Sequence, residues 1–186
     1  MQPDEVLKFW FEETEPQKWF VQDDAFDATI KQRFYSTYQA ARAGSLDAWA
    51  SSPEGTLALV IVLDQFPRNL FRTSGDAFAT DSQALDHAKN LIATDGDQQL
   101  PPQRRHFLYL SFMHSENLAD QEKGVELYQN MGNADALHYM RQHHKIIERF
   151  GRFPHRNQMM DRPSTKDEEE YLERVAQHGL FSEASM

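Results

Sequence analysis

The sequence contains no cysteine and no long apolar run. The absence of cysteine excludes disulfide bonds, thiolate zinc sites and cysteine nucleophiles together. The longest apolar stretch covers residues 57–63, whereas a membrane-spanning helix needs about 20 apolar residues. The first five residues include two acidic residues and no basic one, so they lack the basic and then apolar pattern of a secretion signal. We therefore expect a soluble, cytoplasmic protein that does not span a membrane.

Several motifs that carry catalysis or bind cofactors are also missing. The chain has no Gly-rich phosphate loop, no dinucleotide fingerprint and no Gly-x-Ser-x-Gly elbow. It also lacks the His-Glu-x-x-His spacing of the zinc proteases. Standard nucleotide, serine-hydrolase and zinc-protease chemistries therefore have no support in the sequence, and we expect no cofactor and no bound metal.

Positive charge is scarce over the whole chain but concentrated in one stretch. The net charge is −10, which argues against general binding of nucleic acid or anionic membranes, because phosphate contacts need a broad cationic face. Residues 141–162 are the exception, with six Lys or Arg residues against two acidic ones, a local balance of plus four. A basic island in an acidic chain is a candidate anion site or the hub of a buried ion-pair network.

The chain is long enough and aromatic enough to build a core. Its 186 residues include thirteen Phe and three Trp, which fits one domain with a sizeable apolar interior. We expect a single domain over residues 1–181 and a frayed tail over residues 182–186. The many aromatic residues are compatible with a homodimer, although no specific feature of the sequence indicates one.

Apolar residues recur at helical spacing along most of the chain. The segment 57–63 is ambiguous, because a buried strand and a helix buried on all sides give the same pattern. Helix is favoured there because Ser52-Pro53-Glu54 is a typical helix start and no partner strands are apparent. About eight helices with short connections predict an all-α fold of antiparallel helix pairs. The main expected helices cover residues 4–13, 24–43, 53–66, 76–93, 102–114, 119–131, 133–150 and 164–177.

The first candidate site closes the most apolar helix, at Asp64, Gln65, Arg68 and Asn69. A polar cluster at the mouth of a buried element is a common arrangement for a ligand site. The alternative is structural: Asp64 would pair with an arginine, and Asn69 would satisfy carbonyl groups at the helix end. The sequence leaves both interpretations open.

Two histidines form a second set of candidates. His114 precedes Glu116 at a helix end, where the pair could bind a metal ion, share a proton, or serve as hydrogen-bonded structural residues or the rim of a site. His143 lies on a partly apolar helix face, which favours a buried histidine somewhat over a ligand or a catalytic base. His144 points roughly 100° away from His143, so the two cannot face one metal ion.

The basic island supplies the third set. Gly151 can take the left-handed conformation that ends a helix, and Pro154 blocks its continuation. Arg149, Arg152 and Arg156 offer guanidinium groups, which suit bidentate contact with carboxylate or phosphate. These arginines could hold a ligand, or they could bridge to Asp64, Glu116 or the acidic stretch 167–170.

These residues resemble the signatures of a family called domain of unknown function 924. The resemblance rests on residues 63–72, 112–116 and 149–157, with support from 6–11 and 19–20, and it covers nearly the whole chain. It implies a tetratricopeptide-repeat-like array of antiparallel helix pairs and no assigned activity. Residues 159–162 depart from the smaller turn expected there. The motif positions that the resemblance groups together are Asp64, Gln65, Arg68, Asn69, Arg72, His114, Glu116, His143, Arg152, His155, Arg156 and Asn157.

Three hypotheses follow for these positions. The first is a binding module that holds an anionic small molecule or peptide group in an Arg/His/Asn-rich site. The second is a hydrolase or lyase acting on a small anionic substrate, with His143 or His155 as acid or base and Asp64 or Glu116 as the orienting carboxylate. The third is an internal polar network that fixes the helix ends. The sequence favours the binding module by a small margin.

Overall fold

The computed structural model describes residues 1–182 and residue 185, and within them the chain is helical, with no β-strand. The helical run α3 (Pro53–Val60), a π-helical segment (Ile61–Gln65) and α4 (Phe66–Leu70) is continuous. When this run is taken as one helix, the described residues contain eight α-helices, which confirms the predicted all-α class. The arrangement as a tetratricopeptide-like array remains an interpretation.

The chain divides into two compact units, Met1–Ser111 and Phe112–Met186. The division falls near the end of α6 (Pro102–Met113). The single domain expected over residues 1–181 remains a prediction.

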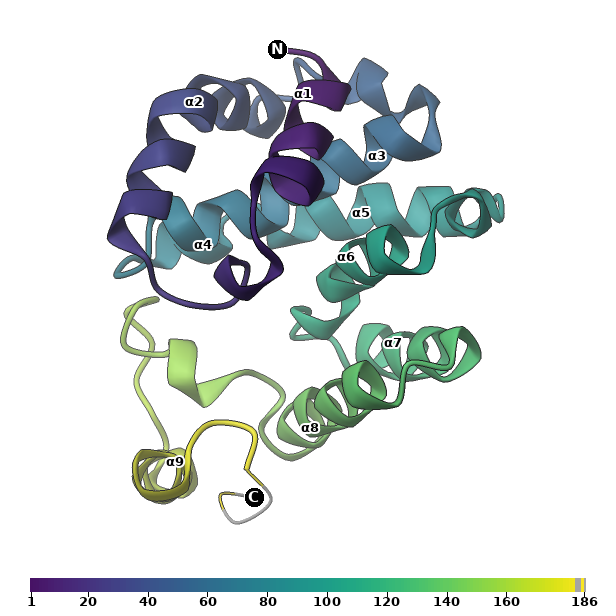
Figure 1. Cartoon of the computed structure of the whole chain (residues 1–186). Helices are drawn as coiled ribbons and strands as arrows, with labels where there is room; N and C mark the ends of the chain where they lie inside the picture. The colour runs from purple at the N-terminus through teal and green to yellow at the C-terminus, as the bar shows by residue number, and fades with distance from the viewer. Residues whose placement is uncertain (183–184, 186) are drawn as a thin grey trace. The chain divides into compact units, whose positions relative to one another are not determined.

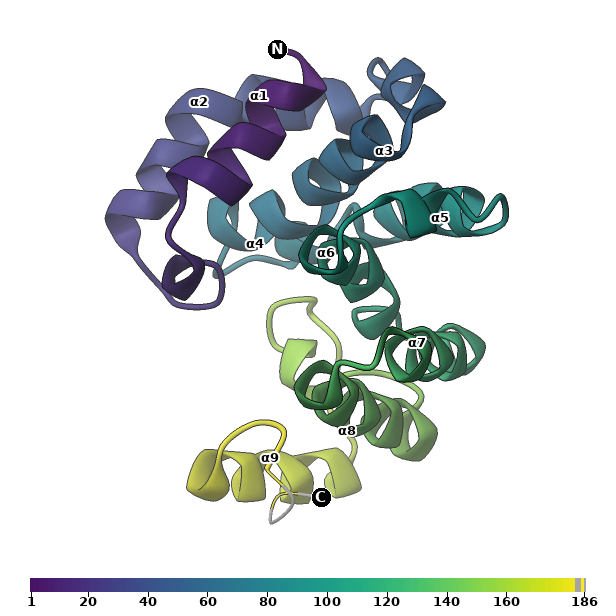
Figure 2. The ribbon, with the colours of Figure 1, turned by 45° about the vertical axis from the view of Figure 1, so that its right-hand side comes forward.

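Unit 1 is held together by an aromatic core. Helix α1 (Pro3–Lys8) continues into a π-helical segment (Phe9–Glu13), followed by α2 (Asp24–Arg42), the run from α3 to α4, and α5 (Asp81–Ile92) (Figures 1 and 2). Trp10, Phe34, Phe66 and Phe107 are fully buried, and Trp10 packs edge-on against both Phe66 and Phe107. Aromatic pairs of this kind add about 0.5–1.5 kcal/mol each beyond the area that they bury.

The ambiguous apolar segment is a helix, as predicted. Every residue from Leu57 to Leu63 is 0% exposed, so this helix is buried on all sides and shows no amphipathic pattern. Ser52 caps its start by accepting a hydrogen bond from the Gly55 N–H. Pro67 lacks the N–H that would normally bond to the carbonyl of Leu63, and the hydroxyl of Thr80 donates to that carbonyl instead at 2.5 Å.

Helix α5 begins later than the sequence indicated. The expected helix covered residues 76–93, but residues Gly75–Phe78 form a separate 3₁₀ turn. The hydroxyl of Ser74 accepts a hydrogen bond from the Asp76 N–H and so starts that turn on its own. Thr80 precedes α5, but its side chain is committed to Leu63, as described above, and not to capping the helix.

Unit 2 contains α7 (Leu118–Met131), α8 (Ala134–Phe150) and α9 (Lys166–His178). Helices α7 and α8 lie side by side in both ribbon views (Figures 1 and 2). Gly124 permits their close approach, because a Cβ atom there would lie 2.7 Å from Sδ of Met140. Gly151 follows α8 with φ +68°, which confirms the predicted left-handed helix stop.

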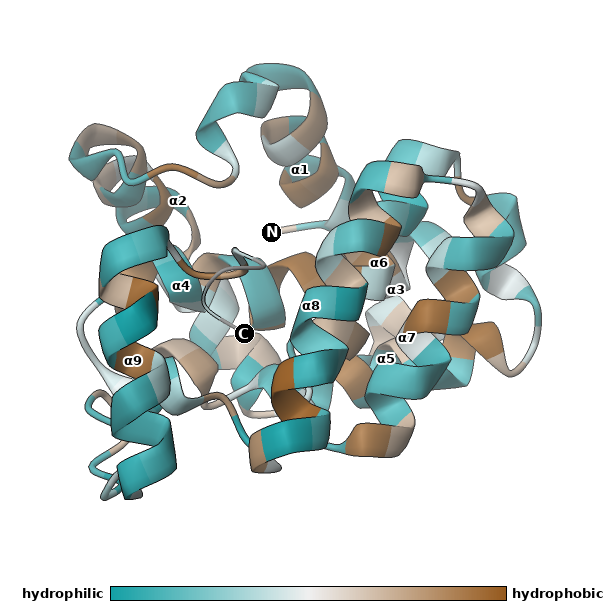
Figure 3. Ribbon diagram, turned by 90° about the horizontal axis from the view of Figure 1, so that it is seen from below, coloured by the Kyte–Doolittle hydropathy of each residue, from teal (hydrophilic) through white to brown (hydrophobic). Residues whose placement is uncertain are grey.

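A small buried apolar cluster of unit 2 lies between α8 and α9. It consists of Ile146, Ile147, Phe153 and Tyr171, with Phe150, Leu172, Val175 and Phe181 packed against it. The ribbon of α9 is mostly hydrophilic with short hydrophobic stretches (Figure 3). Because so few apolar residues hold α9, polar contacts carry much of the connection between α8 and α9.

Two expectations concern the chain as a whole. Among the helices of the described residues, none is long and apolar enough to cross a membrane. Residues 183, 184 and 186 of the expected frayed tail lie outside the described residues. Ser185 is buried, and its hydroxyl donates to the carbonyls of Gly179 and Ser182.

Gly55 provides a test of the packing at the start of α3. A Cβ atom at this position would lie 1.9 Å from the carbonyl oxygen of Trp49, so backbone would have to move. Gly55→Ala should therefore lower the free energy of unfolding by roughly 1–3 kcal/mol, even though alanine is the better helix former by about 1 kcal/mol. Chemical denaturation measures the change.

Gly124→Ala is the matched control, because its nearest obstruction is the flexible end of Met140. It should cost less than Gly55→Ala. An equal or smaller loss at Gly55 would contradict the packing described for α3.

Candidate functional site

The twelve predicted site residues fall into two sets, one in each unit. Asp64, Gln65, Arg68, Asn69 and Arg72 belong to unit 1, where they lie at the end of the buried helical run and just after it. The second set lies in unit 2, around the ends of α6 and α8 and the start of α9; its members are His114, Glu116, His143, Arg152, His155, Arg156 and Asn157.

Asp64 is the centre of the first set. Its side chain is 0% exposed, and it accepts a hydrogen bond from Nε2 of Gln65 at 2.5 Å. Arg68 lies one turn later, with Nη1 at 3.4 Å from Oδ1 of Asp64. The same guanidinium donates two hydrogen bonds of 2.9 Å to Asp81, at the first residue of α5. Arg68 is therefore held between two carboxylates.

The charge on Arg68 is stabilised by this arrangement. Burial alone would lower the pKa of Arg68, but the negative charges of Asp64 and Asp81 raise it above its ordinary value. Arg68 also donates to the backbone carbonyl of Asp64, in a stretch where Pro67 and the π-helical turn disturb the helical hydrogen-bond ladder. Asp64 therefore pairs with an arginine at the helix end, as the structural alternative expected, whereas Asn69 donates to a carboxylate and not to helix-end carbonyls.

The other two residues of the first set reach a different helix. Asn69 donates to Oδ1 of Asp27 at 2.8 Å, and Arg72 donates to both carboxylate oxygens of Asp27, with Nη2 at 2.7 Å from Oδ1. Asp27 lies in the first turn of α2. Together these bonds fasten the end of α4 to the start of α2.

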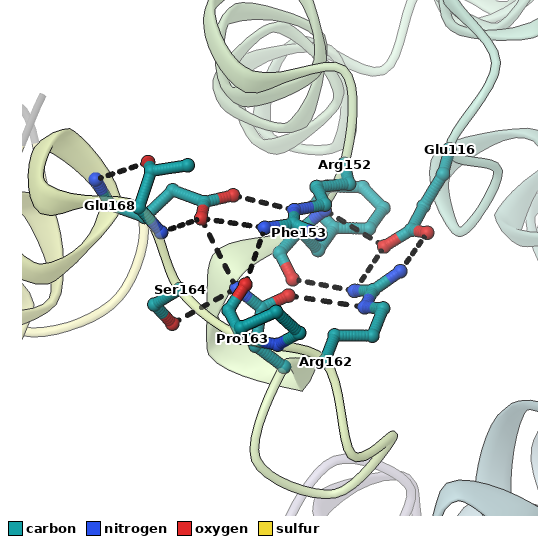
Figure 4. Close-up of polar contacts among 9 residues, drawn as sticks. Glu116, Arg152, Phe153, Arg162, Pro163, Ser164 and Glu168 are labelled. Carbon is teal, nitrogen blue, oxygen red and sulfur yellow. Dashed lines mark hydrogen bonds and ion pairs between the residues drawn. The ribbon is translucent and has the colours of Figure 1, made fainter.

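In unit 2, Glu116 receives three hydrogen bonds. Arg162 donates from Nη1 and Nη2 to its two oxygens at 2.6 and 2.9 Å, and the Phe153 N–H donates at 2.8 Å (Figure 4). Burial would raise the pKa of Glu116, but the hydrogen bonds from Arg162 and Phe153 and the charge of Arg156 lower it. Glu116 is therefore a carboxylate that anchors the segment after α8.

Glu168 is a second anchor of the same kind. Arg152 donates from Nε and Nη2 to its two oxygens at 2.6 and 2.7 Å, and the Thr165 N–H donates at 2.7 Å (Figure 4). The Arg152 hydrogen bond is the main cause that lowers the pKa of Glu168 to about 2. Asn157 joins the two anchors, because its Nδ2 lies 3.4 Å from Oε2 of Glu168 and its Oδ1 accepts from Nε of Arg162 at 3.1 Å.

Three histidines and one arginine form a cluster beside this network. His143 stacks on Phe181 with ring centroids 4.0 Å apart, and its Nδ1 lies 2.8 Å from the carbonyl oxygen of Tyr139. His155 lies beside Phe153, with ring centroids 5.4 Å apart, and the guanidinium of Arg156 lies 4.5 Å above the same Phe153 ring. We call His114, His143, His155 and Arg156 the histidine cluster.

Burial keeps two of these imidazoles neutral. It lowers the pKa of His143 to about 3, and the charges of His114, His155 and Arg156 act in the same direction. Burial and the charge of Arg156 likewise lower the pKa of His155 to about 3. Because a carbonyl can only accept, Nδ1 of His143 carries the proton, and its Nε2 offers a lone pair.

Some partners in these networks were not singled out from the sequence. Asp27, Asp81 and Arg162 are essential to the pairs above, yet nothing in their local sequence distinguishes them from ordinary surface charges. Glu168 did carry a local signal, since it follows Thr165 at capping-box spacing, and both bonds of that box are present. Glu116 and the acidic stretch 167–170 were among the expected arginine partners, and Arg149 does pair with Asp167 at 2.6 Å.

Comparison with known proteins agrees with this picture of the fold. The model of a family described as bacterial protein of unknown function (DUF924) matches residues 6–176. The chain belongs to this family. A solved structure of a protein of unknown function from Agrobacterium tumefaciens is similar, with 40% sequence identity, a TM-score of 0.87 and coverage of 92% of this chain and 96% of that one. No curated protein matches the DUF924 chain.

Asp64 tests the structural role of the first set. Asp64→Ala removes a fully buried carboxylate and leaves Arg68, whose side chain is 22% exposed, with Asp81 as its charged partner among the described residues. We expect a loss of unfolding free energy on the order of 3–5 kcal/mol, as for other broken buried pairs. Thermal and chemical denaturation measure it, with Asp86→Ala on the exposed side of α5 as control. An unchanged or higher stability would indicate that Asp64 is kept for function.

Glu168→Gln isolates the charge of the second anchor, because glutamine can still complete a capping box. We expect it to lower the free energy of unfolding by about 1.5–3 kcal/mol near neutral pH. The folded pKa of about 2 lies below the ordinary 4.5, so this contribution is complete above pH 4.5 and is lost as pH falls toward 2.

The difference in unfolding free energy between wild type and Glu168→Gln should therefore disappear as the pH falls from 7 to 2. Chemical denaturation at each pH measures it. Glu170→Gln is the control, since the one ion pair of Glu170 among the described residues is an exposed contact of 3.9 Å with Lys166. A difference that stays constant over this range would contradict the assignment.

Proposed function

We propose that this protein binds the anionic group of a small molecule or peptide at the histidine cluster of unit 2. One observation carries the proposal: Nδ1 of His155 is buried and has no hydrogen-bond partner among the described residues. Buried polar atoms are almost always hydrogen-bonded, and an exception calls for an explanation. An anionic oxygen accepting from Nδ1–H of His155 would supply the missing partner.

The charge in the cluster supports an anion over a neutral ligand. The side chains of His143 and His155 are neutral, so Arg156 supplies the positive charge. Arg156 is 6% exposed, and its guanidinium carbon lies 4.5 Å from the centroid of the Phe153 ring, a contact that restricts its orientation. A guanidinium with a restricted orientation suits the bidentate geometry of carboxylate and phosphate.

The neighbouring network supports the proposal by positioning the cluster. His155 and Arg156 lie in a short 3₁₀ turn, Pro154–Arg156, between α8 and α9. The Glu116 and Glu168 anchors hold the residues on both sides of that turn. The guanidinium groups of Arg152 and Arg162 are taken up by these carboxylates, so we assign them to the scaffold and assign binding to the cluster.

The alternative function, a hydrolase or lyase on a small anionic substrate, has less support. A general acid or base works best with a pKa near the working pH, whereas His143 and His155 have pKa values of about 3. Glu116, the carboxylate that could orient a histidine, is engaged by Arg162. These features favour binding without turnover.

Thermal denaturation in the presence of inorganic phosphate, succinate or a tripeptide with a C-terminal carboxylate tests the proposal. A ligand at 100 times its dissociation constant should stabilise the protein by about 2.7 kcal/mol, which raises the melting temperature by roughly 5–10 °C for a chain of this length. His155→Phe keeps the ring volume and removes both ring nitrogens, so it should abolish this shift while leaving the ligand-free protein folded.

His138→Phe is the matched control, because His138 is exposed on α8 outside the cluster. It should retain the full shift. A shift that survives in His155→Phe would contradict the proposed site, and conversion of a bound probe into product would favour the hydrolase or lyase alternative.

A further inference from the structure

Unit 1 contains an open cavity to which the family motifs contribute only Phe71. Its volume is about 490 Å³, within the range of small-molecule sites. It lies between the C-terminal half of α2 and the segment that follows α4, and it is lined by Tyr35, Tyr38, Gln39, Arg42, Ala43, Phe71 and Asp76. Five of these seven residues come from α2 and the residue that ends it, so a single helix shapes most of the cavity.

Two opposite charges line this cavity without meeting. Within the described part of the chain, the guanidinium of Arg42 makes no hydrogen bond or ion pair; only the backbone carbonyl of Arg42 is engaged, by Nε2 of Gln83 at 3.1 Å. Asp76 has no cationic partner among the described residues either, and its Oδ2 receives only a 3.3 Å contact from the hydroxyl of Ser74. This contrasts with Arg68, Arg72 and Arg152 of the family motifs, which are bound to carboxylates.

Three aromatic side chains also line the cavity. Phe71 lies 5.5 Å from Tyr38 and 6.4 Å from Tyr35, measured between ring centroids. The Tyr38 hydroxyl is buried without a hydrogen-bond partner in the described structure. Aromatic faces bind apolar groups and also attract ammonium groups, so the wall suits a ligand that is partly apolar and partly cationic.

We propose that this cavity binds a zwitterionic amino acid with an apolar or aromatic side chain. Arg42 would hold the carboxylate, Asp76 would hold the ammonium group, and Tyr35 and Phe71 would contact the side chain. Arg42 and Asp76 are both exposed side chains on the lining, so a ligand with one charge can pair with only one of them, whereas a zwitterion can pair with both. The site is independent of the histidine cluster and of the function proposed for it.

Three related probes test the charge requirement with the full chain. They are L-phenylalanine, 3-phenylpropionate, which lacks the ammonium group, and phenethylamine, which lacks the carboxylate. Isothermal titration calorimetry should show L-phenylalanine binding about tenfold or more tightly than either analogue, because each analogue lacks one of the two charge-assisted contacts.

Two substitutions separate the charges. Arg42→Gln should weaken the binding of L-phenylalanine and of 3-phenylpropionate by about tenfold and leave the binding of phenethylamine unchanged. Asp76→Asn should weaken L-phenylalanine and phenethylamine by a similar factor and leave 3-phenylpropionate unchanged. Lys31→Gln, which removes an exposed cation from the same helix outside the cavity, should alter none of them.

The proposal is overturned if L-phenylalanine does not bind, if the three probes bind equally, or if both substitutions weaken all probes alike. Melting curves of each variant establish that it is folded. If one variant fails to fold, the other variant still tests the proposal, because it should weaken the binding of one analogue and leave the binding of the other unchanged. A positive result here is independent of whether phosphate or succinate binds at the histidine cluster.

Discussion

The segment between α8 and α9 depends on two carboxylates. It contains only one short 3₁₀ turn, and few apolar residues hold α9 in place. Glu116 and Glu168 each bind one arginine with both oxygens and also accept a hydrogen bond from a backbone N–H of the segment. Each carboxylate therefore takes over part of the role that strands or longer helices have elsewhere, which is to satisfy backbone groups and fix the path of the chain.

The same type of contact recurs in unit 1, where Asp27 and Asp81 bind Arg72 and Arg68. Each of the four arginines donates from two nitrogens to the two oxygens of one carboxylate. Lysine could not replace them, because an ammonium group is a point charge without the planar fork that two carboxylate oxygens match. Geometry, as well as charge, explains why the motifs are rich in arginine.

Local patterns predicted the elements well and the polar partners poorly. The helix caps at Ser52 and Thr165 and the stop at Gly151 each depend on residues within about four positions, so the sequence displays them directly. The partners of Arg72 and Arg162 are 45 and 46 residues away, and no short-range pattern encodes such a pair. The twelve residues grouped by the resemblance to the family lie in two separate polar networks, and the resemblance did not indicate their partners Asp27, Asp81, Arg162 and Glu168 or the polar atoms, such as Nδ1 of His155, that have no partner among the described residues.

The distance along the chain between these charged partners has a kinetic consequence. Bringing residues 45 positions apart together costs loop-closure entropy, which local helix formation does not incur. The helices can form and collapse first, and the arginine–carboxylate pairs then close over them late in folding. Contacts that form after the transition state slow unfolding more than they accelerate folding. We therefore expect the arginine–carboxylate pairs to act chiefly by lowering the unfolding rate, which prolongs the lifetime of the native state.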